Sequence, residues 1–340
     1  MKHFSKPSCP DRIPIYYIAA AVLFFSVAVL SLCLGSTSLS LFEVFSSFFR
    51  GQTTSTACRI FLYVRLPRTL SALICGGALA LSGALAQGTL HNRLASPSIL
   101  GVNAGAGLAV TLATAFGILD GFLTSLFAFF GAVLASALIA LFSRRFGLSR
   151  ANVILCGVAL NALFNAITSA VITLIPDVGV MSNDFRIGDF SSVTYRTLLP
   201  ASLVIVTSAV LAFTLSNDLD ALALGDERAM GLGISPHKMR LIFMLLIALL
   251  SGASVSLSGL LSFVGLIVPH VVRMLGVYKS KHLLPLSALF GASFVTLCDT
   301  MARTLFSPYE VPVGILMAIF GSPFFLFLLF SRKGEHYDRM

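Results

Sequence analysis

VPVGILMAIFGSPFFLFLLF, residues Val311 to Phe330, is a run of twenty residues without a charged side chain. A second uncharged run extends from Gly121 to Phe142. An α-helix of about 20 apolar residues crosses the roughly 30 Å hydrocarbon core of a bilayer. We therefore predict that both runs are transmembrane helices.

The composition of the whole chain extends this prediction to most of its length. Of 340 residues, 57% are hydrophobic and only 11% are charged, and the mean hydropathy is +0.94. A soluble domain has about 25% charged residues. The net charge of +9 does not indicate a nucleic-acid partner, because the basic residues are scattered between apolar runs, as topology-setting charges are. We predict an all-α polytopic membrane protein with a single transmembrane domain over residues 1–340.

Hydropathy predicts about ten transmembrane spans, joined by short polar connectors. The seventh and eighth are the hardest to separate, because Leu241 to Pro269 carries no charge. A Ser/Gly cluster from Ser251 to Gly259 predicts a break or tight re-entry between them. The predicted spans lie near residues 13–35, 69–88, 98–119, 121–142, 151–175, 198–215, 239–257, 259–275, 283–302 and 311–331.

The distribution of Lys and Arg predicts the orientation. With the N-terminus in the cytoplasm, 16 of the 23 Lys and Arg residues fall in cytoplasmic segments, and every Lys is among them. Cytoplasmic loops of membrane proteins carry such an excess. The chain is therefore expected to have both termini in the cytoplasm and an even number of spans.

Several classes of protein lose support because their motifs are missing. No Lys follows a Gly, so the chain has no phosphate-binding loop of the G-x-x-x-x-G-K-[ST] type. It has no H-E-x-x-H or G-x-S-x-G motif, and its six His show no metal-ligand spacing. No Asp or Glu is predicted in the middle of a span, which argues against an ion-coupled carrier. We expect neither an enzyme nor a chain that binds a metal or cofactor.

One connector, Asn217 to Gly233, is long and patterned. Asn217 can cap a helix, and the acidic residues after it suit a helix N-terminus. Leu219, Leu222 and Met230 recur at near-helical spacing, so the segment predicts a short amphipathic helix. Such a helix lies either in the lipid headgroups or in a groove on a soluble partner. The pattern alone leaves both readings open.

Short motifs rich in Gly, Pro and Arg recur between about residues 60 and 330. They are Arg65-Leu-Pro-Arg68, Gly76 to Gly83, Gln87-Gly88, His91 to Gly101, Leu224 to Ala229, Leu232-Gly233, Phe263 to His270 with Arg273, Leu284-Pro285, Asp299, Ala302-Arg303, Glu310 to Gly314 and Gly321 to Phe324. Because these motifs occur in the order and spacing typical of that family, the chain resembles the FecCD-type permease subunits of bacterial ABC importers for iron-siderophores, haem and vitamin B12.

The resemblance implies a fold, a location and a set of partners. Members of the family have ten transmembrane helices and lie in the bacterial cytoplasmic (inner) membrane. Two permeases, identical or related, flank one pathway above two separate ABC ATPase subunits that bind ATP-Mg. A periplasmic or lipid-anchored binding protein delivers the cargo. The implied cargo is an iron-siderophore-type chelate, with haem or cobalamin as the alternative. Two other classes of protein stay as distant alternatives to an ABC importer: an ion-coupled carrier and a membrane-embedded enzyme.

The resemblance also implies roles for particular residues. The segment at 217–233 matches the family's coupling helices, which insert into a cleft of the ATPase, and this favours partner docking over lipid binding. The matching residues are Leu224, Gly225, Asp226, Glu227, Arg228, Ala229, Leu232 and Gly233.

Three arginines match family residues that pair with glutamates of the binding protein: Arg65, Arg68 and Arg303. The alternatives are interfacial snorkelling for the first two and a pair with Asp299, one helical turn away, for Arg303.

Asn92, Leu94 and Asn152 match the segments around the cytoplasmic gate, although a loop-capping role is open for both Asn residues. Gly83, Gly101 and Gly105 are expected at helix-packing contacts.

One segment departs from the family pattern. Phe185 to Phe190 resembles a W-x-x-G-S motif near the entrance, but it carries Arg186 and Asp189. The departure leaves room for a different cargo.

Overall fold

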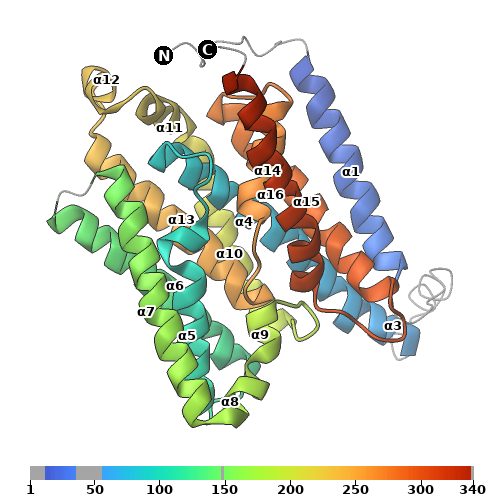
Figure 1. Cartoon of the computed structure of the whole chain (residues 1–340). Helices are drawn as coiled ribbons and strands as arrows, with labels where there is room; N and C mark the ends of the chain where they lie inside the picture. The colour runs from blue at the N-terminus through green and yellow to red at the C-terminus, as the bar shows by residue number, and fades with distance from the viewer. Residues whose placement is uncertain (1–11, 36–55, 147–148, 338–340) are drawn as a thin grey trace.

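The computed structural model describes residues 12–35, 56–146 and 149–337, and in these ranges all regular structure is helical (Figure 1). Ten helices follow the ten predicted spans in chain order. They are α1 (Ile13–Cys33), α4 (Leu66–Leu90), α5 (Val102–Ala115), α6 (Gly121–Arg145), α7 (Arg150–Leu174), α10 (Tyr195–Thr214), α13 (Pro236–Ser258), α14 (Val264–Met274), α15 (Ser280–Thr304) and α16 (Val313–Tyr337).

Among the described residues, seven helices are long and apolar enough to cross a membrane by length and composition. One of them is continuous from Thr56 to Leu90, because α3 (Thr56–Ile60) and a π-helical turn, η2 (Phe61–Arg65), lead directly into α4. The apolar helices α5 and α14 are shorter, and so is the part of α16 whose side chains the structure describes, Val313–Leu326. The all-helical membrane architecture is therefore confirmed, while the assignment of residues 1–340 to one domain stays a prediction.

The chain breaks at Gly259, the last residue of the Ser/Gly cluster, as expected, and a short loop there separates α13 from α14. Helix α13 continues through Ser251 and Ser254 and ends only at Gly259, where φ is +67°. The Ser254 hydroxyl donates to the Leu250 carbonyl oxygen at 2.7 Å, and the Ser251 hydroxyl bonds to its helix in the same way. These hydroxyl groups are satisfied by carbonyls of their own helix, so they are buried without an unpaired donor.

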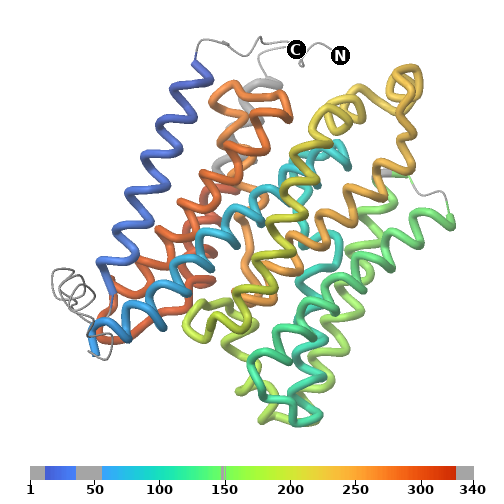
Figure 2. Tube along the Cα trace, turned by 180° about the vertical axis from the view of Figure 1, so that it is seen from behind, coloured from blue at the N-terminus to red at the C-terminus, as the bar shows by residue number. Residues whose placement is uncertain are grey.

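Helices α4, α13 and α15 form the core of the bundle. In the most apolar 18-residue stretch of each helix, the buried share of residues is 83% for the helix that contains α4, 78% for α13 and 67% for α15. It is only 17% for both α1 and α7. Both views place α1 at the edge of the bundle, beside α15 (Figures 1 and 2). The exposed apolar faces of α1 and α7 are therefore left for lipid or for another chain.

Close helix crossings depend on glycine. A Cβ placed on Gly105 of α5 would lie 2.5 Å from the Gly131 carbonyl oxygen of α6, and a Cβ on Gly131 would lie 2.5 Å from the Gly105 oxygen. In the same way, a Cβ on Gly83 of α4 would overlap the backbone of Gly265 in α14. Small residues let membrane helices approach this closely. The positions agree with the packing role expected of Gly83 and Gly105.

The two ends of the bundle carry different short helices. At one end, here named the α11 face, lie α11 (Ser216–Ala223) and α12 (Asp226–Gly231), together with the start of α1 and the end of α16 (Figure 1). At the opposite end, the α8 face, lie α3 and α8 (Pro176–Met181). Helix α9 (Asn183–Ile187) folds back from α8 towards the middle of the bundle, and η3 (Pro97–Leu100) leads into α5.

Candidate functional site

The α11 face carries the segment that we expected to be a coupling helix. Leu219 and Leu222 of α11 are almost fully buried, and Leu219 packs against Gly88 at the end of α4. The His91 Nε2 atom lies 2.6 Å from the Leu222 carbonyl oxygen. Helix α11 is therefore fixed onto the end of the central helix α4.

Two polar contacts join the same segment to other long helices. The Asp220 carboxylate accepts hydrogen bonds from the Ser280 backbone N–H at 3.0 Å and from its hydroxyl at 2.6 Å, at the first residue of α15. The Arg240 guanidinium of α13 donates to both carboxylate oxygens of Asp226, at 3.1 and 3.0 Å. Both contacts come from the Nη2 atom, and charge-assisted hydrogen bonds of this kind are stronger than neutral ones. Polar contacts therefore join α11 and α12 to α4, α13 and α15.

The surface of α12 and its flanks is exposed and partly apolar. Leu224, Met230 and Leu232 are 52%, 58% and 63% exposed, and the charged side chains of Glu227 and Arg228 are exposed between them. Ala229 is buried, so it packs the helix onto the protein. An exposed apolar patch with polar residues at its rim is typical of an interaction site.

The structure corrects the shape predicted for residues 217–233. The segment forms two helices, because Gly225 adopts a φ of +104° between them. The helix begins at Ser216, and Asn217 does not cap it. The predicted single stripe is also wrong, since Leu219 and Leu222 are buried whereas Met230 faces outwards. Gly233, with a φ of +79°, ends the exposed segment as expected.

An ionic cluster centres on Arg68 in the first turn of α4. Its guanidinium donates to Asp299 of α15 at 3.0 Å and to Glu310, before α16, at 2.7 Å. It also lies 3.5 Å from a carboxylate oxygen of Asp189. Arg303 lies 3.2 Å from the second carboxylate oxygen of Asp299. The cluster therefore holds together segments that are far apart in the sequence.

The three predicted docking arginines lie inside the protein. Arg65, Arg68 and Arg303 are only 3%, 5% and 3% exposed. Arg65 donates to the Cys33 carbonyl oxygen at 2.7 Å, where it caps the end of α1. The pair of Arg303 with Asp299, which was the alternative, is present. Direct docking would require Arg68 and Arg303 to leave the ionic cluster and Arg65 to leave the end of α1, and the docking role of all three stays a prediction.

The predicted gate residues lie in a connector and at a helix start. The Asn92 side-chain oxygen accepts the Leu94 N–H at 2.9 Å, so it stabilises its own turn. Leu94 itself is exposed. Asn152 is exposed in the first turn of α7, whose start is capped by the Ser149 hydroxyl, not by Asn152. The gate role of all three residues stays a prediction.

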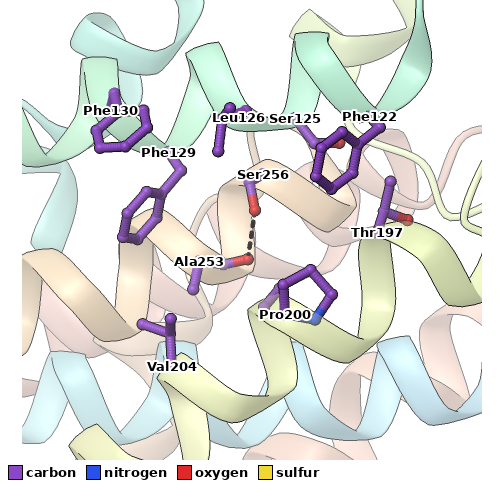
Figure 3. Close-up of a pocket in the computed structure, with 11 residues that line it drawn as sticks. Phe122, Ser125, Leu126, Phe129, Phe130, Thr197, Pro200, Val204, Ala253 and Ser256 are labelled. Carbon is purple, nitrogen blue, oxygen red and sulfur yellow. Dashed lines mark hydrogen bonds between the residues drawn. The ribbon is translucent and has the colours of Figure 1, made fainter.

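Two cavities differ sharply in their chemistry. A polar cavity of about 560 Å³ lies between α5, α7 and α9 and is lined by four Asn and by Arg186. A smaller one of about 140 Å³ lies between α6, α10 and α13 (Figure 3). Phe122, Phe129 and Pro200 enclose it, and the hydroxyl of Ser256 donates to the Ala253 carbonyl oxygen. Only the first is suited to a polar solute.

Similarity to known proteins gives this architecture a family. The sequence pattern of the FecCD transport family matches residues 22–331. The chain belongs to the FecCD transport family. It is 35% identical to the Fe(3+)-citrate import permease YfmD of Bacillus subtilis, with 99% of each chain covered. It is 36% identical to the hemin transport permease HmuU of Yersinia pestis, over 92% of this chain and 96% of that one.

A solved structure confirms the FecCD-type fold. It is described as an inward-facing conformation of a metal-chelate type ABC transporter, and it matches with a TM-score of 0.81 at 33% identity, covering 94% of this chain and 99% of that one. The vitamin B12 import permease BtuC of Yersinia pseudotuberculosis is 34% identical over 82% of this chain. The FecCD chain is thus a multi-pass permease subunit of an ABC importer and is not itself catalytic.

The sequence reasoning missed the polar cavity of this FecCD permease. Asn161, Asn165 and Ser169 follow one another at intervals of four along α7. This period places them on one face of a helix. Three polar side chains on one face of a predicted membrane span were the available signal, because such residues usually mark a pathway or a helix contact.

Proposed function

We propose that this permease imports an iron-siderophore-type chelate into the cytoplasm at the expense of ATP hydrolysed by a separate subunit. The single observation that carries the proposal is the exposed patch of Leu224, Met230 and Leu232 on a segment fixed to three core helices. Among the relatives, the Bacillus subtilis permease is named for Fe(3+)-citrate import and matches over nearly its whole length.

We infer that the α11 face is cytoplasmic and that both termini lie on that side. Arg144 and Arg145 end α6, Arg228 lies in α12, and Lys238 lies in the first turn of α13, all towards the α11 face (Figure 1). Positive charges concentrate on the cytoplasmic side of membrane proteins. This orientation presents α12 to the compartment that contains ATP.

The inferred assembly has two permeases, two ABC ATPases and a periplasmic or lipid-anchored binding protein. ATP-Mg binds to the ATPases, and this chain is inferred to bind no cofactor of its own. Closure of the ATPase pair would push on α12, and the Asp226–Arg240 and Asp220–Ser280 contacts would pass that motion to α13 and α15. ATP would then shift the equilibrium between two states of the transporter, because it binds one state more tightly than the other.

Haem is the second candidate cargo, because the Yersinia pestis relative named for hemin transport is as similar as the Fe(3+)-citrate permease. Cobalamin, named for the BtuC relative, follows at lower coverage. The cargoes differ in chemistry, and uptake of ferric citrate, haemin and cyanocobalamin by proteoliposomes that contain the whole transporter separates them.

The coupling role is tested by replacing Glu227 and Arg228 with Ala. Both side chains are exposed, so the fold is expected to survive. Uptake driven by ATP should fall, and either the ATPase should co-purify less or its hydrolysis should no longer depend on cargo. Arg144→Ala, an exposed residue outside α12, is the matched control. Unchanged uptake in the double variant would refute the proposal, as would uptake that persists without ATP and stops when ion gradients are collapsed.

A further inference from the structure

The polar cavity between α5, α7 and α9 has the composition of a binding site for an anion. Eight of its twelve lining residues are Ser, Thr, Asn or Arg, and the set includes no Asp or Glu. A cavity with one cation and several amides has a net positive charge and many hydrogen-bond donors. The residues that carry the argument are Asn103 from α5, Asn161, Asn165 and Ser169 from α7, and Asn183 and Arg186 from α9.

The α7 side of this cavity is unsuited to contact with lipid tails. Asn165 and Ser169 are exposed in the chain, one turn apart in the middle of a membrane-spanning helix. An amide that faces hydrocarbon without a hydrogen-bond partner costs about 2 kcal/mol or more. Leu163 and Ile167, on the same turns, are apolar and exposed and supply the lipid-compatible surface. The polar stripe therefore faces water or protein.

Several polar groups in the cavity have capacity left for a ligand. Asn161 donates to the Ser98 carbonyl oxygen at 2.8 Å, but its own side-chain oxygen is buried and accepts no hydrogen bond within the described residues. Across the same described ranges, the Arg186 side chain is exposed and its guanidinium forms no ion pair or hydrogen bond, so it is open to water or to a ligand. Buried polar atoms without a partner are uncommon in folded proteins, so the Asn161 oxygen calls for an explanation, and a ligand hydroxyl could donate to it.

The backbone holds Arg186 in place even though α9 has only five residues. The Phe185 carbonyl oxygen accepts the Leu260 N–H at 2.9 Å, and the Gly188 oxygen accepts the Gly314 N–H at 3.1 Å. These bonds join the middle of α9 to the loop after α13, and the residue after α9 to the start of α16. A site on a fixed backbone is organised before its ligand arrives, which limits the entropy lost on binding.

We propose that this cavity is a cargo subsite for an anionic, oxygen-rich chelate of the ferric citrate type, with Arg186 as its charged anchor. The proposal rests on the importer function and narrows it. Carboxylate and hydroxyl oxygens accept hydrogen bonds from a guanidinium and from Asn amides. Haem presents a large apolar ring, for which these walls offer few apolar partners, and the apolar cavity of about 140 Å³ is too small for it.

Charge-selective labelling tests the cavity without transport. Asn165→Cys is introduced into a chain whose other cysteines are replaced by Ala, and the assembled transporter in nanodiscs is treated with anionic and cationic methanethiosulfonates. The anionic reagent should react faster, Arg186→Gln should remove this preference, and ferric citrate should slow the reaction. Arg196→Gln, an exposed arginine outside the cavity, should leave the preference intact. Equal reaction rates for the anionic and cationic reagents overturn the proposal. Failure of both reagents to label the cysteine at position 165 also overturns it, because the polar side chains of α7 are then buried against a second permease.

Uptake tests the same site in the chain with its native cysteines. Arg186→Gln should lower the initial rate of ATP-driven ⁵⁵Fe-citrate uptake by about tenfold, the size expected for losing a charge-assisted hydrogen bond. Arg186→Lys should restore part of the rate, and Arg196→Gln should transport at the wild-type rate. An unchanged Arg186→Gln rate, or a wild type that imports haemin but not ferric citrate, overturns the proposal while the importer function stands. Absence of ATP-driven uptake of both probes counts against the importer function, and labelling then decides the cavity.

Discussion

The crossing of α5 and α6 offers the sharpest test of how this bundle is packed. A Cβ on Gly105 would lie 2.5 Å from the Gly131 carbonyl oxygen and 2.5 Å from the Ala135 Cβ. A carbon and a carbonyl oxygen normally approach no closer than about 3.3 Å. Gly105→Ala therefore forces the two helices apart by roughly 0.8 Å, and since the obstacle is backbone, no side-chain rotation relieves it.

The cost follows from this separation. Overpacking a close contact destabilises a protein by about 1–3 kcal/mol. For a chain of this size, with an unfolding entropy of about 2.1 cal/mol/K per residue, that is a fall in melting temperature of roughly 1–4 °C. Gly131→Ala should cost a similar amount, because its Cβ meets the Gly105 oxygen and the Ala109 Cβ at the same 2.5 Å. The double variant should cost less than the sum, since one separation accommodates both methyl groups.

Thermal melting of the detergent-purified permease measures all three variants. Gly107→Ala, on the same helix, is the control, because its Cβ meets only the Leu260 Cδ1 atom at 3.5 Å. It should melt at or slightly above the wild-type temperature, since Ala is the better helix former. The reasoning is refuted if Gly105→Ala melts like this control. Strict additivity in the double variant would also contradict it, because the two methyl groups would then not share one crossing.

Three further predictions concern charges. Arg68→Ala removes one partner of the Asp299 carboxylate, which has no exposed surface, and should lower the free energy of unfolding by about 3–5 kcal/mol. Arg196→Ala, in an exposed pair with Asp120, should lower it by at most about 1 kcal/mol. Thermal melting compares the two variants, and equal costs would contradict a buried cluster. Asp220→Ala removes the cap on α15 and should cost about 0.5–2 kcal/mol, with faster amide exchange confined to the first turn of α15. Arg240→Ala should increase amide exchange in α12 and lower ATP-driven uptake while the melting temperature changes little; full uptake would show that the Asp226 contact transmits no motion.

The ten helices that follow the predicted spans within the described residues could be predicted, because each depends on local composition. Val311 to Phe330 is apolar along its length, so the bilayer requirement alone predicts a helix there. The motif order, from Arg65 to Phe324, identified the family without any contact being known. The family and the helical membrane fold were thus available from the sequence, and the comparisons confirm both.

Tertiary structure decided what the individual side chains do. Arg68 and Asp299 are separated by 231 positions, and only the packing of α4 on α15 shows that they form a buried pair and do not reach the surface. The break at Gly225 depends on a backbone angle, and the cavity around Arg186 depends on three helices that meet. Hydropathy is a sum over neighbours in the sequence, whereas an ion pair or a cavity depends on distances between residues far apart in it. The sequence of this permease therefore specified its spans, and the packing of those spans specified its sites.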